Sequence, residues 1–408
     1  MKITYISKYA VLPEFGAPTR QYFLSKYMAA SGHEVKLIGS RSIPEKVPPF
    51  KGLYRSVKEG NLEMVTLQGP PVKLGFSLKR VWSWLVFEIN LFRYYRHLKK
   101  FKPDVVIVSS LSILTFIFGV YVKKKLKIPL VLEIRDIYPL TLVEVGNYSP
   151  RHPLVKFIGW VEKYGYKHAD LILSTLPNCD QHIEKVMGKK VNFKWIPMGI
   201  DPDYFGINPS DPAPAFQPEP GVFKIGYAGT IGLANAMDVI FEAAADLEKD
   251  YPDIRFIITG DGPMKPDYIK KYGHLKNIEF RDPVSKKGLQ PLLTTMNLLI
   301  HSYLNQPIYR YGVSPNKWID YMLSARPVLV ALGGQTCIVG DAGCGIFVRP
   351  EDKEALKKGI LEFYKKSPEE LDEMGRKGRE YLLSNLTYPY LAGVLSEQLE
   401  KVVKQYYQ

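Results

Sequence analysis

The chain of 408 residues is 46% hydrophobic and 24% charged, which excludes a disordered polymer and is typical of a soluble globular protein. At about 150 residues per domain, this length predicts two or three domains. The formal net charge of +14 predicts an anionic partner, such as a phosphorylated substrate, an anionic lipid surface or a nucleic acid.

Little in the sequence indicates export or a metal centre. The three cysteines (Cys179, Cys337 and Cys344) are far apart and form no C-x-x-C pair, which argues against a zinc site or a disulfide framework. No histidines show a metal-ligand spacing, and His301 is expected to be structural. Residues 2–6 read as a strand rather than a secretory signal, and the apolar run 111–122 is too short to cross a bilayer. We therefore expect a cytoplasmic protein.

Strand and helix patterns alternate along the first half of the chain. Strands are predicted at residues 2–7, 34–39, 104–109, 129–136, 169–174 and 193–197. Helices are predicted between most of them, including residues 19–31, which Gly32 ends. This alternation predicts a parallel sheet with helices on both faces.

The same alternation restarts after a proline-rich segment, residues 208–221, which we interpret as a linker. Strands are predicted at residues 223–228, 255–260, 277–281, 298–302, 327–331 and 345–348, again with helices between them. The sequence thus predicts an α/β protein of two doubly wound, Rossmann-like domains, residues 1–207 and 222–385. In such folds ligands bind outside the carboxyl ends of the strands, here in a cleft between the domains.

The segment 311–330 is predicted to be a loop, a short helix and a strand. Pro315 suits a helix start, and Ser314 before it is predicted to be the N-cap. The free N–H groups of residues 314–317, the positive helix end and the Lys317 ammonium would then converge on a diphosphate, with Asp320 one turn further along. An ordinary capped helix with a solvated lysine remains the alternative.

Other candidate ligand residues follow predicted strands of the second half. Gly229, Thr230 and Gly232 lie in a turn whose glycines would let backbone N–H groups approach a phosphate. Asp261 ends the next strand, and Pro283 and Val284 follow the one after. Ordinary turns without a ligand remain the alternative.

In the first half, the predicted strand 129–136 ends in Arg135 and Asp136. Burying two opposite charges there is costly unless they pair or meet a ligand. In the loop after the first strand, Gly16 permits close approach to a ligand and Arg20 is positioned to meet a phosphate. A structural ion pair and a plain connecting loop are the alternatives.

Several of these stretches resemble one family. Residues 317–330 resemble the donor-binding segment of retaining glycosyltransferases of family 4. The element Arg135-Asp136-Ile137-Tyr138-Pro139 resembles the Arg-Asp-x-Trp-Pro element of its N-acetyl-L-fucosaminyl transferase branch in bacterial surface polysaccharide biosynthesis. The resemblance implies the two-domain glycosyltransferase B (GT-B) fold, with a last helix, residues 386–408, crossing back to the first domain.

The resemblance also assigns roles to residues and shows departures from the family. Asp320 stands where the family has a glutamate that holds the ribose, and the loop at Val284 would hold uracil through backbone groups. Family cations are replaced here by Thr230 and Ala236, and a family glutamate by Gly312, so Lys317 and Arg310 are expected to supply the positive charge.

The implied function is a retaining transfer of a sugar, an N-acetylated amino sugar, from a UDP-sugar to a polyprenyl-diphosphate-linked saccharide. The diphosphate would be stabilised by the Ser314 N–H, Asn316 and Lys317, without a metal or another cofactor. Arg135 and Asp136 would position or polarise the acceptor. A hydrolysing UDP-sugar 2-epimerase and a non-enzymatic membrane scaffold with a decayed sugar site are the alternatives.

Residues 78–102 form a predicted helix with apolar residues on two faces. One stripe contains Leu78, Trp82, Leu85, Ile89 and Phe92, and the other contains Trp84, Phe87, Leu91, Tyr95 and Leu98. Basic residues surround both stripes, so we expect one face to lie on an anionic membrane at the cytoplasmic side. A helix packed on both sides is the alternative. Nucleic acid is not expected as a partner, because no recognised binding fold accompanies the charge.

Overall fold

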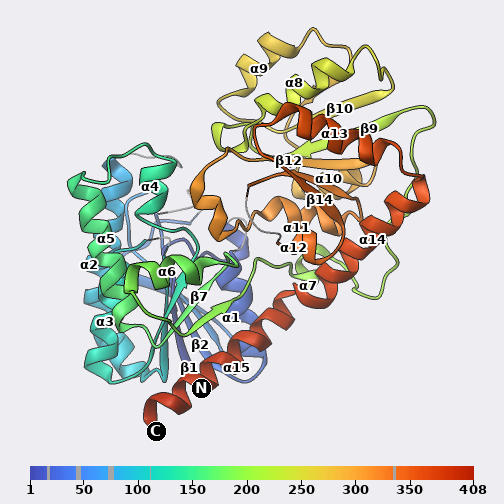
Figure 1. Cartoon of the computed structure of the whole chain (residues 1–408). Helices are drawn as coiled ribbons and strands as arrows, with labels where there is room; N and C mark the ends of the chain where they lie inside the picture. Colours follow the sequence, from blue (N-terminus) through green and yellow to red (C-terminus); the bar gives the residue numbers. More distant parts are fainter. Residues whose placement is uncertain (16–18, 43–46, 72–77, 111, 334–336) are drawn as a thin grey trace. The chain divides into compact units, whose positions relative to one another are not determined.

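The computed structural model describes residues 1–15, 19–42, 47–71, 78–110, 112–333 and 337–408, and the chain divides into two compact units (Figure 1). Unit 1 comprises Met1–Asp201 and Tyr388–Gln408, and unit 2 comprises Pro202–Thr387. Each unit is an α/β domain built on one sheet, as the alternating patterns predicted.

Unit 1 contains an eight-stranded sheet in the order β3-β4-β2-β1-β5-β6-β7-β8. The strands are β1 (Lys2–Ile6), β2 (Glu34–Ser40), β3 (Tyr54–Glu59), β4 (Leu62–Leu67), β5 (Val105–Ser109), β6 (Leu130–Ile134), β7 (Leu171–Ser174) and β8 (Phe193–Trp195). All neighbours are parallel except β3 and β4, a hairpin that the sequence did not predict. Edge strand β3 is mostly exposed and polar, so it carries no buried apolar pattern to detect.

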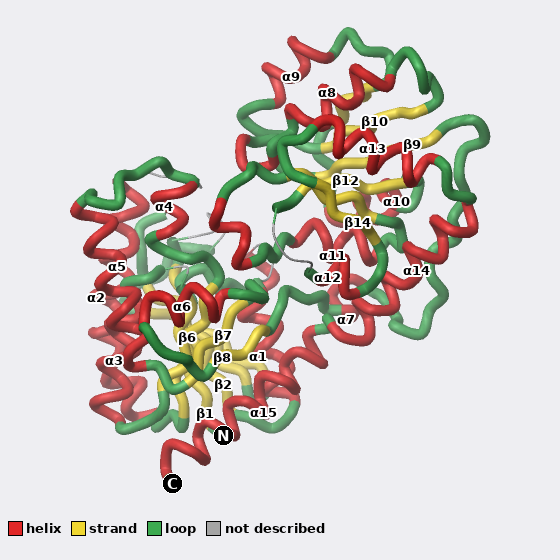
Figure 2. Tube along the Cα trace, in the orientation of Figure 1, coloured by secondary structure: helices red, strands yellow, loops and turns green. Residues whose placement is uncertain are grey.

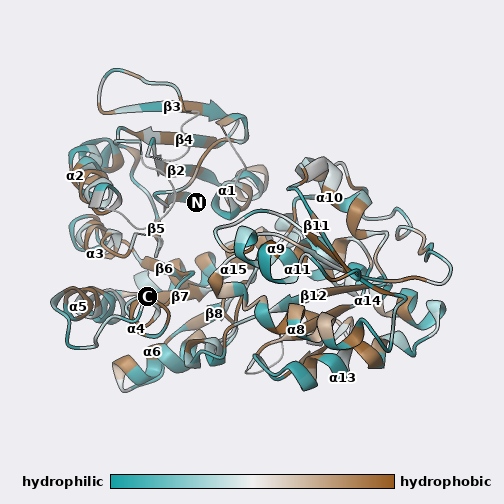
Figure 3. Ribbon diagram, turned by 90° about the horizontal axis from the view of Figure 1, so that it is seen from above, coloured by the Kyte–Doolittle hydropathy of each residue, from teal (hydrophilic) through white to brown (hydrophobic). Residues whose placement is uncertain are grey.

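Helices cover both faces of this sheet (Figure 3). One layer contains α1 (Arg20–Ala30) and α15 (Tyr388–Tyr407), which pack together through Phe23 and Tyr388, whose ring centroids lie 4.9 Å apart. The other contains α2 (Leu78–Phe101), α3 (Thr115–Leu126) and α5 (Pro153–His168). The short helices η1 (Pro13–Phe15), α4 (Leu140–Glu144) and α6 (Cys179–Met187) complete the unit.

Unit 2 contains a six-stranded parallel sheet in the order β11-β10-β9-β12-β13-β14. Figure 2 shows strands of this sheet in yellow, among them β9, β10, β12 and β14. The strands are β9 (Phe223–Ala228), β10 (Ile254–Thr259), β11 (Ile278–Arg281), β12 (Leu298–Ser302), β13 (Val328–Ala331) and β14 (Gly345–Val348). Three of them, β9, β12 and β14, have the predicted bounds. For the central strands β9 and β12 the reason is a short buried run between turn residues.

The helices of unit 2 also form two layers around the sheet. They are α7 (Pro202–Phe205), η2 (Leu233–Asn235), α8 (Asp238–Leu247), α9 (Lys265–Tyr272), α10 (Lys286–Leu293), η3 (Pro307–Tyr311), α11 (Asn316–Leu323), α12 (Ile338–Asp341), α13 (Lys353–Tyr364) and α14 (Pro368–Asn385). Helix α8 packs with α13, and α11 packs with α10 and α14.

The unit boundary differs from the predicted linker. It falls between Asp201 and Pro202, and the proline-rich residues 208–221 belong to unit 2. The buried Arg326 holds this segment, since its guanidinium lies 4.4 Å from the Phe216 ring centroid and donates to the Pro214 carbonyl at 3.0 Å. A buried guanidinium requires such acceptors, and the local proline content gives no sign of them.

The strand order reverses at one place in each sheet. In unit 1 the reversal lies between β1 and β5, and in unit 2 it lies between β9 and β12. At such a reversal the loops after the two neighbouring strands run in opposite directions and leave a crevice between them. In doubly wound domains ligands bind in this crevice, at the carboxyl ends of the strands.

Candidate functional site

A pocket of about 410 Å³ lies in unit 2 beside the strand reversal. It is lined by Ala228, Gly229, Thr230, Thr259, Gly260, Asp261, Pro283, Val284, Leu289, Asn316, Lys317 and Asp320. These residues come from the loops after β9, β10 and β11 and from α10 and α11. Seven predicted donor-binding residues therefore lie together: Gly229, Thr230, Asp261, Val284, Asn316, Lys317 and Asp320.

Two glycines in the pocket wall let neighbouring groups pack closely against the backbone. Gly229 has a φ of +148°, and a Cβ there would overlap the Cε atom of Lys317. Gly260 has a φ of +146°, and a Cβ there would overlap the carbonyl oxygen of Gly229. Both positions require glycine, because the lysine stem and the two loop backbones occupy the space of a side chain.

Lys317 supplies a cation in this wall. Its Nζ donates to Oδ1 of Asn235 at 2.9 Å and lies 5.0 Å from the centroid of the Tyr227 ring. Burial lowers the pKa of Lys317 to about 8, and within the described part of the chain no acidic group offsets this shift. An anion entering the pocket would therefore meet a poorly compensated positive charge.

Three residues beside the pocket were not predicted to act there. Asn235 and His301 contact each other, with His301 Nε2 3.2 Å from Asn235 Oδ1. Lys265 donates to the carbonyls of Gly260 and Arg281, each at 2.9 Å, and so ties together the loops after β10 and β11. These side chains carry no local motif, since only the packing of distant loops gives them their partners.

The sequence predicted that Pro315 begins α11 and that Ser314 is its N-cap, and both predictions are wrong. The N-cap is Pro315, which is extended (φ −78°, ψ 141°) and makes no side-chain cap. The first helical turn therefore begins at Asn316, so Ser314 lies one residue too early to cap it. Ser314 is half-buried and does not line the pocket, whereas the N–H groups of Asn316 and Lys317 lie in the first turn beside it.

The remaining predicted donor residues lie elsewhere. Arg310, expected to supply positive charge, is exposed and stacks over Tyr311, with 4.8 Å from its Cζ to the ring centroid. Gly232 is buried just before η2 and has open space for a Cβ, with only Thr230 near it at 3.6 Å. Gly16 lies outside the described residues. Among those described, no group of three His, Cys, Asp or Glu side chains could hold a metal ion.

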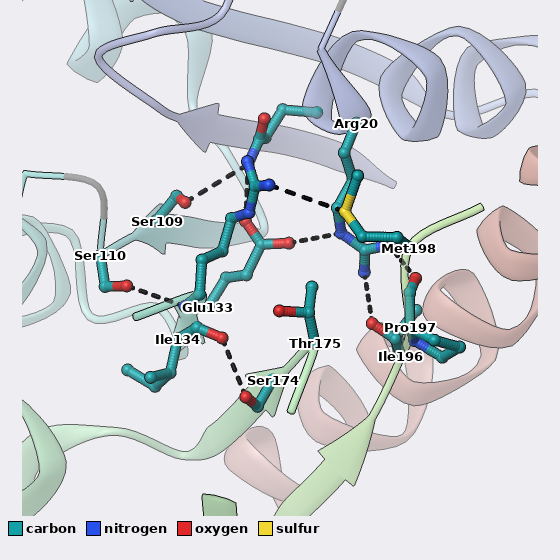
Figure 4. Close-up of polar contacts among 12 residues, drawn as sticks. Arg20, Ser109, Ser110, Glu133, Ile134, Ser174, Thr175, Ile196, Pro197 and Met198 are labelled. Carbon is teal, nitrogen blue, oxygen red and sulfur yellow. Dashed lines mark hydrogen bonds and ion pairs between the residues drawn. The ribbon is translucent and has the colours of Figure 1, made fainter. Parts of the chain in front are cut away.

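In unit 1 a buried polar network lies at the carboxyl ends of β5 and β6 (Figure 4). Arg20 Nε donates to Glu133 Oε1 at 2.9 Å, and both side chains are 1% exposed. Arg20 also donates to the carbonyls of Ile196 and Pro197. The predicted phosphate contact of Arg20 is therefore wrong, because protein acceptors already occupy its guanidinium.

Glu133 is an ionised member of this network. Burial alone would raise the pKa of its carboxyl, but the Arg20 and Arg135 guanidinium groups beside it hold that pKa below its usual value. Gln21 Nε2 donates to its second oxygen at 2.9 Å. The buried ion pair at this sheet edge is thus Arg20–Glu133.

Arg135 and Asp136 lie just after β6, which ends at Ile134 and not at the predicted Asp136. The Arg135 N–H donates to Ser110 Oγ at 2.9 Å, and its guanidinium lies 3.6 Å from Met198 Sδ. Arg135 is half-buried and Asp136 is exposed, so both are more accessible than Arg20 and Glu133.

Comparison with known families identifies both halves of the chain. Residues 16–204 match the family described as Glycosyltransferase Family 4, and residues 222–366 match the family described as Glycosyl transferases group 1. Both halves of the chain belong to glycosyltransferase families. This agrees with the family resemblance of the donor segment and with two Rossmann-like units.

Two curated proteins are similar to this chain in sequence. Alpha-monoglucosyldiacylglycerol synthase of Acholeplasma laidlawii is 27% identical over 234 residues, which cover 50% of this chain and 58% of that protein. Alpha-D-kanosaminyltransferase of Streptomyces kanamyceticus is 26% identical over 134 residues, which cover 30% of this chain and 32% of that protein. The chain thus spans less than two thirds of the length of either relative.

Solved structures share the fold over nearly the whole chain. Sucrose-phosphate synthase from Thermosynechococcus elongatus superposes with a TM-score of 0.72 and 14% identity, covering 99% of both chains. HepE from Anabaena, in complex with UDP, superposes with a TM-score of 0.62 and 14% identity, covering 98% of this chain and 100% of that one. At this level of identity the likeness establishes the GT-B fold.

Proposed function

We propose that the protein transfers a sugar from a UDP-sugar with retention of anomeric configuration. The observation that carries this proposal is the pocket of unit 2, where Lys317 and the first turn of α11 face the loops after β9 and β10. A diphosphate leaving group needs a cation and N–H donors at one point, and both are present. HepE, which has the same fold, is a UDP complex.

Each part of the donor would meet one part of the pocket. Lys317, Asn316 and the N–H groups of the first α11 turn would stabilise charge on the diphosphate as the glycosidic bond breaks. Asp320 would accept a hydrogen bond from the ribose, and the loop at Val284 would hold uracil. The acceptor hydroxyl would attack from the face that the diphosphate leaves, so no covalent intermediate and no metal are required.

For the donor sugar and acceptor we propose an N-acetylated amino sugar and a polyprenyl-diphosphate-linked saccharide, as in surface polysaccharide biosynthesis. The Arg135–Asp136 element, which resembles that of N-acetyl-L-fucosaminyl transferases, supports this choice. Arg135 would meet the acceptor diphosphate, and Asp136 would position the attacking hydroxyl. One sequence relative is named for kanosaminyl transfer, and the other for synthesis of a glucosylated diacylglycerol.

A lipid-linked acceptor implies a membrane contact, and we assign it to the outer side of α2. Trp82 and Ile89 on this side are 58% and 54% exposed, whereas Phe87, Leu91 and Leu98 on the other side are buried. In the same helix layer Trp160 of α5 is 56% exposed. Helices α2, α3 and α5 of this layer also carry exposed basic residues: Lys79, Arg93, Arg96, Lys99, Lys124, Lys125, Lys156 and Lys163. Aromatic and basic side chains together suit an anionic bilayer surface.

No helix in the described part of the chain is both long and apolar enough to span a bilayer. The contact proposed here would therefore lie in the headgroup region. The protein would act at the cytoplasmic face of the cell membrane.

The donor site is tested with Lys317→Met, which keeps the stem and removes the charge. UDP at one hundred times its dissociation constant should stabilise the wild-type protein by about 2.7 kcal/mol, seen as a rise in melting temperature. The variant should lose most of this rise, and sugar transfer should fall about 100-fold. Unchanged UDP binding by the variant would overturn the assignment. Release of UDP and free sugar without any acceptor would favour the epimerase instead.

The membrane contact is tested by flotation with vesicles that contain anionic phosphatidylglycerol or only neutral phosphatidylcholine. The double variant Trp82→Ala, Ile89→Ala should bind anionic vesicles about tenfold more weakly, since two exposed apolar side chains are removed. The matched control is Ile269→Ala, which removes an apolar side chain 44% exposed in unit 2. Equal binding by all three proteins would contradict the contact.

A further inference from the structure

Asn235, the last residue of η2, connects three parts of unit 2 through its side-chain amide. Its Nδ2 donates to the Thr230 carbonyl at 2.9 Å. Its Oδ1 lies 2.9 Å from Lys317 Nζ and 3.2 Å from His301 Nε2. The orientation of the amide is therefore determined, because the nitrogen faces an acceptor and the oxygen faces two donors.

His301 reaches this oxygen as a neutral ring. It is 1% exposed, and its burial first, then the nearby Lys317 charge, hold the pKa of the imidazole well below its usual value. A neutral histidine that donates from Nε2 leaves only one cation on the Asn235 oxygen. Lys317 thus shares its acceptor without electrostatic repulsion from the ring.

The segment that carries Asn235 is fixed at both ends. Ser302 Oγ, at the end of β12, donates to the carbonyls of Asn235 at 2.5 Å and Ala236 at 3.1 Å. The Tyr227 hydroxyl donates to the Thr230 carbonyl at 2.6 Å. Because these bonds hold the backbone on either side, the position of the amide oxygen is set by the fold rather than by Lys317.

We infer that Asn235 is a positioning residue for the donor diphosphate, because it holds the Lys317 ammonium at the pocket wall with a neutral acceptor. A carboxylate at this place would pair with the lysine and offset its charge before a ligand arrives. An apolar residue would leave the buried ammonium without this acceptor, so that it would lose its proton more readily. The amide retains both the position and the charge. This inference rests on the proposed function, since it assumes that the pocket takes a nucleoside diphosphate.

Several titratable groups face Lys317 from the surrounding elements. Tyr227 lies under the ammonium on β9, and His301 lies beside it on β12. Asp261 and Asp320 line the same pocket, from the loop after β10 and from α11. Tyr227 has a pKa raised by burial, so it stays neutral across the pH range in which Lys317 titrates.

The test compares Asn235→Asp and Asn235→Ala with the wild-type protein, with UDP as the probe. UDP affinity is measured by calorimetry from pH 6.5 to 9.5, without turnover. Wild-type affinity should decline above a pH of about 8, as Lys317 loses its proton. Asn235→Asp should weaken UDP binding about tenfold at pH 7 and move the alkaline decline to higher pH. Asn235→Ala should move the decline to lower pH, because the ammonium loses an acceptor.

The pH of the alkaline decline should thus move in opposite directions in the two variants. A loss of folding would instead weaken UDP binding in both variants in the same way. Leu233→Ala is the matched control, since Leu233 lies on η2 and is 67% exposed. It should keep the wild-type profile. If both Asn235 variants keep the wild-type affinity and alkaline decline, the inference is wrong. If the wild-type protein binds no UDP at any pH, the proposed function itself has failed.

Discussion

The two strand reversals of this protein present opposite solutions to a buried charge. In unit 1, Arg20 is bound by a carboxylate and two backbone carbonyls, so its charge is compensated within the fold. In unit 2, Lys317 has a neutral amide and an aromatic ring as its partners, and it lines a pocket. A charged side chain at a strand reversal therefore indicates a ligand only when no opposite charge of the protein compensates it.

The pKa shifts express the same difference. Glu133 of the first network has a pKa below its usual value, because two arginines overcome the cost of burial. Lys317 has a pKa lowered to about 8, and burial is the cause of this shift. A bound diphosphate would stabilise the charged form of Lys317, as the arginines already stabilise the charged form of Glu133.

The largest expected effect concerns the Arg20–Glu133 pair, which we expect to stabilise the folded protein. Arg20→Met should leave Glu133 buried without its main partner and destabilise the protein by about 3–5 kcal/mol. Urea unfolding measures this change. Lys2→Met is the control, since Lys2 forms an ion pair with Glu34 in which both side chains are about half exposed, and it should cost less than about 1 kcal/mol. A similar small cost for Arg20→Met would remove the distinction between the two units.

A second variant tests whether the unit 2 site depends on close packing. Gly229→Ala places a Cβ where the Lys317 stem lies and forces a residue with a side chain into a φ of +148°. UDP binding should weaken about tenfold or more as the ammonium is displaced, with a smaller effect on unfolding. Gly232→Ala is the matched control, because that Cβ would meet only Thr230 at 3.6 Å. Equal effects of the two substitutions would contradict the packing argument.

The smallest effect concerns an uncompensated acid in unit 1. Glu88 of α2 accepts from Thr115 at 2.6 Å and from Ser112 at 3.2 Å. Burial raises its pKa to about 8 despite these bonds and the nearby Lys8. At pH 7 it is therefore protonated when folded and ionised when unfolded, so the stability from this group is complete below about pH 4.5 and declines as pH rises towards 8.

Glu88→Gln removes that dependence on pH. The variant should melt about 2–4 °C above the wild type at pH 8, with little difference at pH 4.5. Melting curves at the two pH values measure the change. Glu34→Gln, on an exposed residue, is the control and should show no such dependence. A lower melting temperature for Glu88→Gln at pH 8 would show that ionised Glu88 stabilises unit 1 through Lys8.

Much of the fold was predictable from local patterns. Buried runs such as Phe223–Ala228 and Leu298–Ser302 specified central parallel strands, because both faces of such strands must be apolar. Most of the donor pocket was predictable for the same reason, since Gly229, Asp261 and Lys317 each follow or face the end of such a strand. The polar edge strand β3 was not predicted, because it lacks this constraint.

Tertiary structure decided which charges are compensated. In the sequence, Arg20 and Lys317 are both cations near the start of a helix, and both were candidates for binding phosphate. Only the fold brings Glu133, more than a hundred residues away, onto Arg20, and the amide of Asn235 onto Lys317. By itself the sequence determined the two α/β units and the loops that carry the site, because strand patterns and glycine turns are local. The partners of each buried charge depend on contacts between distant segments, and these exist only once the chain has folded.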